Sequence, residues 1–172
     1  MTRNRWIILG LLLVIISIFV MNPDNKDGTK TKVGNKAPSF SVTTTNGHTV
    51  ALDSLRGKVV LLNFFATWCA PCNAEMPHLE AVWQRFKDKN FSVLALGREH
   101  TTQEVNIFKK QKGISFAMAP DQLRAVYRHY ASKYIPRSYV IDKNGTIVFQ
   151  TKGYDPYEFE LMIEVIEAEI AK

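Results

Sequence analysis

Residues 59–72 read VVLLNFFATWCAPC, and this stretch decides the fold of the chain. Its first half, Val59–Phe65, is almost wholly apolar and has the length of one strand, which is typical of a strand buried on both faces. The only two cysteines of the chain, Cys69 and Cys72, follow directly. Apolar residues then recur at helical spacing from Met76 to Phe86. The stretch therefore predicts a buried strand, a Cys-x-x-Cys motif and a helix that the motif opens.

The position of the cysteine pair at the start of a helix has chemical consequences. A thiol there meets unpaired backbone N–H groups and the positive end of the helix dipole, which favour the thiolate and lower the cysteine pKa. Pro71 suits the first helical turn, where its missing N–H costs nothing. Two intervening residues let Cys69 and Cys72 close a small disulfide, so the pair can cycle between dithiol and disulfide. We therefore interpret it as a redox pair.

Two other interpretations of the cysteine pair are disfavoured. A zinc or copper site needs further ligands, and the four histidines show no His-x₃₋₅-His spacing, so we expect no metal site. An inert structural disulfide is also disfavoured, because closing so short a loop adds little stability.

The flanking sequence predicts an α/β domain that begins at Ala37. An Asn-Gly turn at 45–48 separates two short alternating segments and predicts a β-hairpin. Strands that alternate with helices and close with a hairpin and a helix indicate a central mixed sheet flanked by helices. The further strands are expected at 91–96, 138–141 and 146–151, and the further helices at 102–112, 123–130 and 159–170.

Most of the positive charge lies outside this expected domain. The chain of 172 residues has a formal net charge of +6. Residues 1–36 hold six basic and two acidic side chains, which leaves a net charge of +2 for the rest of the chain. The domain contains no run of Lys and Arg interleaved with aromatic residues. We therefore expect no nucleic-acid partner.

The N-terminal residues predict a membrane anchor. Residues 6–21, WIILGLLLVIISIFVM, carry no charge and are close to the length that spans a bilayer, about 20 residues. No small-x-small cleavage site follows, which favours an uncleaved signal anchor over a cleaved peptide. We expect a transmembrane helix within residues 1–21, a flexible tether over 22–36 and the folded domain over 37–172. Long domains after such anchors translocate largely regardless of charge, so we expect this one on the extracytoplasmic side.

Residues 64–72, FFATWCAPC, resemble the active-site stretch of the thioredoxin superfamily. The branch they resemble most contains the membrane-anchored thiol–disulfide oxidoreductases related to TlpA and ResA, which face the outer side of the bacterial cytoplasmic membrane. Segments 37–40, 55–60 and 75–77 are similar to that branch, as is the additional strand–helix sequence between 96 and 135. The resemblance implies a thioredoxin-like fold with an N-terminal β-hairpin and a strand–helix insertion.

The resemblance also implies roles for residues around the motif. Cys69 matches the nucleophile, and Cys72 matches the thiol that resolves the mixed disulfide. Trp68 resembles the tryptophan that flanks the site, and Ile135–Pro136 resembles a cis-proline loop that faces the cysteines. Contact with the substrate protein is therefore expected at Trp68, Ala70, Pro71, Ile135 and Pro136.

One position departs from the thioredoxins, which carry a buried acid on the strand before the motif to move the proton of the resolving thiol. The matching residue is Asn63, which cannot titrate. Glu99, just after the strand at 91–96, is our candidate catalytic proton acceptor, since partial burial there would raise its pKa. His100 and His78 are weaker candidates and are expected at the surface.

The sequence therefore predicts a membrane-tethered enzyme that exchanges dithiol for disulfide with protein partners, without a cofactor beyond the Cys69–Cys72 pair. The resemblance implies a reductant that takes electrons from an integral-membrane donor and acts on secreted proteins, for example apocytochromes c before haem attachment. Residues 6–21 would contact the lipid bilayer. Two alternatives stay open. One is a thiol peroxidase, because Ala37–Phe40 also resembles the opening segment of peroxiredoxins; the other is a non-enzymatic, thiol-based metal carrier.

Overall fold

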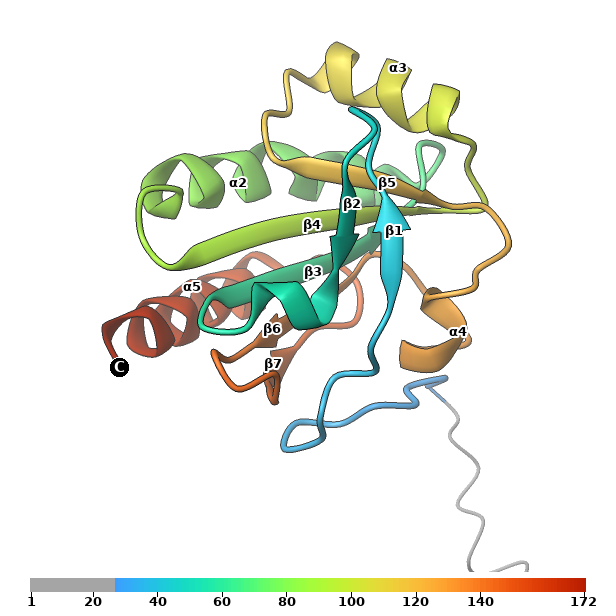
Figure 1. Ribbon diagram of the computed structural model, residues 1–172. Helices are drawn as coiled ribbons and strands as arrows, with labels where there is room; N and C mark the ends of the chain where they lie inside the picture. The colour runs from blue at the N-terminus through green and yellow to red at the C-terminus, as the bar shows by residue number, and fades with distance from the viewer. Residues whose placement is uncertain (1–26) are drawn as a thin grey trace, which may run out of the picture.

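A five-stranded mixed sheet forms the centre of the structure, a computed structural model that describes residues 27–172 (Figure 1). Three neighbouring strands at one side of the sheet run parallel, and each of the two remaining strands runs antiparallel to the strand before it in the sheet. The order across the sheet is β5 (Ala117–Asp121), β4 (Phe91–Arg98), β3 (Val59–Phe65), β6 (Arg137–Ile141) and β7 (Ile147–Gln150).

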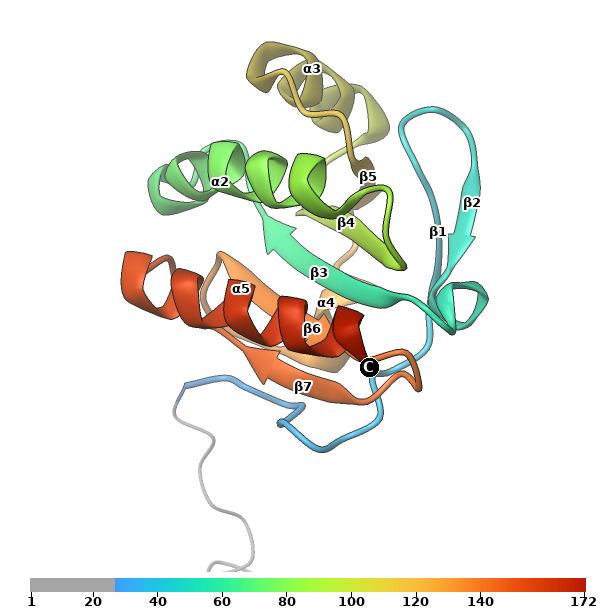
Figure 2. The ribbon, with the colours of Figure 1, turned by 90° about the vertical axis from the view of Figure 1, so that its left-hand side faces the viewer.

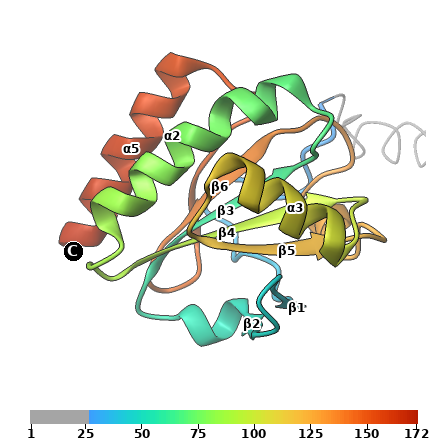
Figure 3. The ribbon, with the colours of Figure 1, turned by 90° about the horizontal axis from the view of Figure 1, so that it is seen from above.

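The two faces of this sheet are covered by different elements (Figure 2, Figure 3). The helices α2 (Ala70–Phe86), α3 (Thr102–Lys112) and α5 (Pro156–Ala171) pack on one face. The other face is covered by the hairpin β1 (Ser41–Thr43) and β2 (Thr49–Ala51), the 3₁₀ helix η1 (Leu52–Leu55) and the short helix α4 (Tyr127–Tyr130). The cysteine motif lies where central strand β3 passes into α2.

Strand β3 shows why the sequence folds in this way. All seven of its residues are buried. Val59, Leu61 and Phe65 contribute to the core beneath α2 and α5, while Val60, Leu62 and Phe64 contribute to the core beneath α4 and the hairpin. Because successive side chains of a strand point to opposite faces, apolar residues at both odd and even positions are needed to fill both cores, and Asn63 is the one polar residue of this strand. Each such side chain contributes roughly 1.5–3 kcal/mol through burial.

The expected thioredoxin-like α/β fold is confirmed, together with the β-hairpin, the central strands and the closing hairpin and helix. The insertion between residues 96 and 135 was expected to contain a strand, but no strand was placed at the position of β5. Its sequence, AMAPD, includes Pro120 and lacks clear alternation. Proline is tolerated there because β5 is an edge strand with a side that needs no ladder hydrogen bonds.

Helix α4 is shorter than the helix expected over residues 123–130. It begins at Tyr127, and Arg124 just before it has a left-handed φ of 54°. The buried carboxylate of Asp121 accepts hydrogen bonds from the N–H groups of Val126 (3.0 Å) and Tyr127 (2.8 Å). These side-chain bonds stabilise a turn in place of the first helical turn.

Residues 27–36 differ from the flexible tether that we expected over 22–36. Thr29 pairs with Ala131, and Lys36 with Thr146, in isolated β-bridges. The N–H of Lys30 also donates to the carbonyl of Tyr130 at 2.9 Å. The described part of the expected tether is therefore a strap hydrogen-bonded along the domain, and we call residues 27–36 the N-terminal strap.

A buried arginine fixes the first turn of this strap. The side chain of Arg137, only 1% exposed, donates to Thr29 Oγ1 at 2.5 Å and to the backbone oxygen of Asp27 at 2.6 Å. Its Nε donates to the backbone oxygen of Lys133 at 3.3 Å. The guanidinium is thus satisfied by oxygens of the strap and of the loop before β6, which holds these two segments together.

The expected membrane anchor over residues 1–21 lies outside the described residues. Among residues 27–172, no helix is both long and apolar enough to cross a membrane.

Candidate active site

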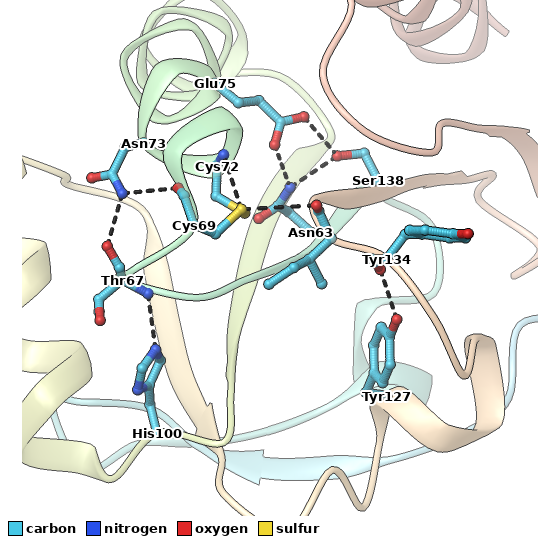
Figure 4. Close-up of a disulfide and its surroundings, with 11 residues drawn as sticks. Asn63, Thr67, Cys69, Cys72, Asn73, Glu75, His100, Tyr127, Tyr134 and Ser138 are labelled. Atoms are coloured by element: carbon cyan, nitrogen blue, oxygen red, sulfur yellow. Dashed lines mark hydrogen bonds between the residues drawn. A yellow bond between two sulfur atoms is a disulfide. The ribbon is translucent and has the colours of Figure 1, made fainter. Parts of the chain in front are cut away.

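The two cysteines form a disulfide at the start of α2, with their Cα atoms 5.2 Å apart (Figure 4). Cys69 is the N-cap residue of the helix, and its Sγ accepts the N–H of Cys72 at 3.3 Å. Cys69 is 6% exposed, whereas Cys72 is fully buried. A partner protein can therefore reach only the first sulfur, and the helix terminus offers that sulfur a backbone N–H donor.

The loop between β3 and α2 is held at the backbone of Thr67, two residues before Cys69. Asn73 Nδ2 donates to the carbonyl oxygens of Thr67 (2.8 Å) and Cys69 (2.9 Å). On the other side, the N–H of Thr67 donates to His100 Nε2 at 2.9 Å. His100 is buried, so its expected surface position is wrong.

A buried carboxyl group lies beside the cysteine pair. Glu75, three residues after Cys72 and only 1% exposed, accepts hydrogen bonds from Asn63 Nδ2 (2.9 Å) and Ser138 Oγ (3.1 Å). In Figure 4 these three side chains converge next to Cys72. Burial raises the pKa of Glu75 to about 7, and the two donated hydrogen bonds limit the rise. The carboxyl can thus take up and release a proton near neutral pH.

The register of the sheet brings this acid and its partners together. Asn63 on β3 lies directly opposite Ser138 on β6, and Asn63 Nδ2 also donates to Ser138 Oγ at 3.0 Å. Both face α2, where Glu75 lies one helical turn beyond Cys72. A polar residue in the middle of a buried strand needs such a partner, because its burial without hydrogen bonds costs free energy.

The loop before β6 faces Cys69 from the other side. The Ile135–Pro136 peptide bond is cis, as the resemblance implied. The carbonyl oxygen of Ile135 lies 3.8 Å from Cys69 Sγ. Tyr134 has a left-handed φ of 65°, and its carbonyl accepts the hydroxyl of Tyr127 at 2.7 Å. The loop therefore places a backbone carbonyl against the reactive sulfur.

Exposed side chains surround Cys69. Trp68 is 65% exposed, with the guanidinium of Arg98 lying 5.9 Å from the centroid of its ring, and it is therefore a surface aromatic. Ala70 and Pro71 are exposed as well, Ile135 is partly buried and Pro136 is buried. The residues expected to contact a substrate protein thus lie in the two segments on either side of Cys69 Sγ, the motif and the cis-proline loop.

Glu99 lies in a different environment from the one expected. Its side chain is 45% exposed, and its carboxylate lies 3.1 Å from Arg98 and 3.7 Å from Arg124. Its φ of 65° marks the end of β4. The premise of partial burial is therefore wrong, because the Glu99 side chain lies in solvent beside two arginines. The buried acid of the site is Glu75, which belongs to the segment 75–77 that resembles the TlpA and ResA branch.

Two signals in the sequence pointed to Glu75. Asn63 interrupts a strand that is buried on both faces, so a polar partner had to lie opposite. Glu75 is three residues after Cys72 on the same helix, which places it on the face that looks at this strand. His78, by contrast, is exposed as expected, and its ring stacks on Tyr154 with centroids 5.7 Å apart.

The residues described by the structure offer no group of three or more His, Cys, Asp or Glu that could hold a metal ion. The chemistry of the site rests on the sulfur pair, the buried carboxyl and the backbone around them.

Comparison with known proteins agrees with this site. The model of the AhpC/TSA family matches residues 33–150. The thiol-disulfide oxidoreductase ResA of Bacillus anthracis is 34% identical over 157 residues, covering 89% of this chain and 91% of that protein. ResA of Bacillus subtilis (strain 168) is 31% identical over 154 residues, covering 88% and 86%.

Solved structures are similar over most of the chain as well. A putative protein disulfide isomerase from Bacteroides thetaiotaomicron aligns with a TM-score of 0.81 at 34% identity, covering 84% of this chain and 94% of that one. A putative thiol:disulfide interchange protein DsbE from Chlorobium tepidum aligns with a TM-score of 0.75 at 32% identity, covering 81% and 98%. The chain therefore belongs to the AhpC/TSA family and, with its cysteine pair, is a thioredoxin-like thiol–disulfide oxidoreductase similar to ResA.

Proposed function

We propose that this enzyme is a membrane-tethered reductant of protein disulfides on the outer side of a bacterial cytoplasmic membrane. The observation that carries the reaction is the unequal exposure of the two sulfurs, with Cys69 reachable and Cys72 fully buried at the start of α2. Such a pair can attack a partner disulfide with one thiol and release the partner with the other.

The reaction proceeds in two exchanges. The thiolate of reduced Cys69 attacks one sulfur of a partner disulfide, forms a mixed disulfide and releases the other partner sulfur as a thiolate. Cys72 then loses its proton and attacks Cys69 Sγ, which forms the Cys69–Cys72 disulfide and releases the second partner sulfur. Two electrons pass to the partner, whose two sulfurs leave as thiolates and take up protons from the surrounding solvent and from protonated groups such as Glu75, so that it leaves as a dithiol.

Glu75 is the proposed proton acceptor for Cys72. It is buried beside the pair, and its pKa of about 7 lets it be ionised in a useful fraction of molecules at neutral pH. A group whose pKa lies near the working pH is an efficient general base. Asn63 and Ser138 donate to both carboxylate oxygens, which supports the ionised form that must accept the proton.

The proposed docking surface for the partner consists of the two segments beside Cys69. Trp68, Ala70 and Pro71 would contact one side of the partner chain, and Ile135 and Pro136 the other. The carbonyl of Ile135, 3.8 Å from Cys69 Sγ, is positioned to accept a backbone N–H of an extended partner segment. Contact through backbone atoms would allow partners of different sequence.

The names of the relatives support thiol–disulfide exchange. We propose in addition that this enzyme reduces its partners rather than oxidising them. A reductant in an oxidising compartment needs a renewable source of electrons, which we assign to an integral-membrane thiol donor. Its partners would be exported proteins with disulfides, such as apocytochromes c before haem attachment. The apolar residues 6–21 are the proposed single-pass anchor.

Trapping of the mixed disulfide tests the mechanism. In cells that produce the full chain, a Cys72→Ser variant should accumulate a partner bound through Cys69, visible as a larger species on a non-reducing gel and absent after reduction. Cys69→Ser is the matched control, because it keeps one thiol but loses the one that retains some access to solvent. Absence of any trapped species with Cys72→Ser would contradict the proposed exchange.

Two measurements test the extracytoplasmic position of the domain and the alternative of a thiol peroxidase. A membrane-impermeant maleimide added to intact cells should label reduced Cys69, since the chain has two cysteines and both lie in the domain; labelling only after lysis would contradict the extracytoplasmic position. The reduced full chain should consume hydrogen peroxide no faster than a free dithiol. Rapid consumption would favour a thiol peroxidase instead.

A further inference from the structure

The backbone of the loop before Cys69 is anchored by an imidazole that the exchange mechanism does not use. His100 is 5% exposed at its side chain, and its Nε2 lies 2.9 Å from the N–H of Thr67 that it accepts. In Figure 4 the ring points at the segment between β3 and α2, on the far side of the loop from Glu75. His100 therefore contacts the reactive segment without contacting a sulfur.

The end of β4 is built to bring this ring under the loop. Glu99 adopts a left-handed φ of 65°, and the N–H of His100 turns back to donate to the carbonyl of Gly97 at 3.3 Å. A Cβ at Gly97 would lie 2.6 Å from Val105 Cγ2 and 3.3 Å from His100 Cβ. Glycine therefore allows β4 to approach Val105 on α3 closely, and the His100 ring lies between α3 and the loop, packed beside Phe65 with centroids 6.3 Å apart.

The hydrogen bond from Thr67 defines the protonation state of the ring. Because a backbone N–H donates to Nε2, that nitrogen must carry a lone pair, and the single ring proton must be on Nδ1. Nδ1 is buried without a hydrogen-bond partner among residues 27–172. Glu104 Oε2 on α3 lies 3.9 Å away but already accepts from the N–H (2.7 Å) and the hydroxyl (2.8 Å) of Thr101.

The charges around His100 oppose one another. Glu104 on α3 and Glu99 after β4 favour the imidazolium, and Arg98 on β4 disfavours it. The loop contributes the Thr67 N–H, whose positive end faces Nε2. Burial is the dominant influence and lowers the pKa of His100, so the ring is neutral at pH 7.

Protonation would reverse the contact with the loop. An imidazolium carries hydrogens on both nitrogens, so Nε2–H would point at the N–H of Thr67 and the hydrogen bond would be lost. The carbonyl of Thr67 would remain bound to Asn73 Nδ2 at 2.8 Å. Thr67, directly before Trp68 and Cys69, would then keep only one of the two side-chain hydrogen bonds to its backbone.

We infer that His100 is a positioning residue of this active site. Its neutral imidazole holds Thr67 so that Cys69 Sγ stays at the helix terminus and opposite the carbonyl of Ile135, and exchange slows when the imidazole is protonated. The inference rests on the proposed disulfide exchange at Cys69. It gives the enzyme an acid limb in its pH dependence that belongs to neither sulfur nor to Glu75.

Two substitutions distinguish the contribution of the hydrogen-bond acceptor at His100 from that of the shape of its ring. His100→Gln keeps an oxygen acceptor in reach of the Nε2 position and cannot titrate in the relevant range. His100→Phe keeps a ring of similar shape and has no acceptor. His48→Gln, at the exposed turn between β1 and β2, is the matched control for removal of a histidine.

The first measurement follows the rate at which the reduced full chain attacks the small disulfide 5,5′-dithiobis(2-nitrobenzoate), between pH 4.5 and 8. Dividing the wild-type rate by the His100→Gln rate cancels the titration of Cys69 itself. We expect this ratio to be near one at pH 8 and to fall about three- to tenfold in acid, the loss of one hydrogen bond. His100→Phe should be slower than His100→Gln by a similar factor at every pH, and His48→Gln should match the wild type.

The second measurement reads the contact directly in the oxidised full chain. The amide ¹H and ¹⁵N signals of Thr67 should shift with pH in the wild type, following the His100 ring, and should not titrate in His100→Gln. A constant rate ratio together with an unresponsive Thr67 amide would overturn the inference. Failure of partner trapping with a titrating Thr67 amide would instead contradict the proposed function and leave the positioning contact in place.

Discussion

Two carboxyl groups of this enzyme have opposite environments although both lie close to the active-site loop in sequence or space. Glu75 is buried with Asn63 and Ser138 on the sheet face beneath α2. Glu99 is exposed at the end of β4, between Arg98 and Arg124. The difference shows that position along a strand–helix motif does not by itself define a proton acceptor. Burial raises the pKa of the Glu75 carboxyl, whereas Glu99 lies in solvent beside two arginines.

The largest expected difference between the two acids is kinetic. Glu75→Gln should slow the resolving attack of Cys72 on a preformed mixed disulfide by about 100-fold at pH 7, because a positioned base is lost. Stopped-flow release of a thiol-labelled peptide measures this step. Glu99→Gln is the matched control and should remain within about twofold of the wild type. If the resolving rate of Glu75→Gln also stays within about twofold of the wild type, Glu75 is not the proton acceptor.

The second difference is in the dependence of stability on pH. The pKa of Glu75 is about 7 in the folded protein and 4.5 is its ordinary value. Between these values the folded state keeps the proton and the unfolded state loses it, so stability falls as pH rises from 4.5 to 7, by about 3 kcal/mol. Glu75→Gln should lack this loss and be more stable than the wild type at pH 8.

Urea unfolding of the oxidised protein at pH 5 and pH 8 measures that difference, with Glu99→Gln as the control for removing a surface carboxylate. If Glu75→Gln loses as much stability as the wild type between these two pH values, the carboxyl of Glu75 is not held protonated by burial.

A smaller change is expected from the hydroxyl that supports Glu75. Ser138→Ala removes the O–H that donates to Glu75 Oε1 at 3.1 Å, and this hydrogen bond favours the ionised form. The pKa of Glu75 should therefore rise further, and the midpoint of the resolving rate against pH should move up by about one unit. A midpoint that moves down, or stays in place, would separate the rate from the titration of Glu75.

The smallest effect is expected at the exposed acid. Arg124→Gln removes a cation 3.7 Å from Glu99, at a position where both side chains are well exposed. Exposed ion pairs contribute little, so the free energy of unfolding should change by less than about 0.5 kcal/mol, and exchange kinetics should not change. A marked loss of activity would return Glu99 and its arginines to the candidate site.

The sequence was most informative where one local pattern dictated one structure. An apolar run without polar interruption except Asn63 could only be the central strand, and the cysteines after it could only open a helix. Short-range rules failed where side chains from distant segments decided the outcome. Asp121 shortened α4 by capping backbone N–H groups, and Arg137 bound a strap more than a hundred residues away.

The site was predictable to the same extent. Cys69, Cys72 and the cis bond before Pro136 follow from the motif and the resemblance. Glu75 had only the indirect signals of Asn63 and of its spacing from Cys72, and His100 had none, because their contacts depend on which side chains the sheet and α3 bring against them. A histidine looks the same in sequence whether its ring is in solvent or accepts a backbone N–H, and burial alone separates the two cases.

The N-terminal strap has a consequence for where the enzyme can work. If residues 6–21 lie in a bilayer, only residues 22–26 separate that anchor from the strap, and five residues span at most about 18 Å. These five residues are therefore a short connection. They lead into the N-terminal strap, which is hydrogen-bonded to the domain beside the loop that carries Pro136. A domain held in this way would remain close to the membrane surface, where it would meet proteins as they emerge from export rather than those that have diffused away.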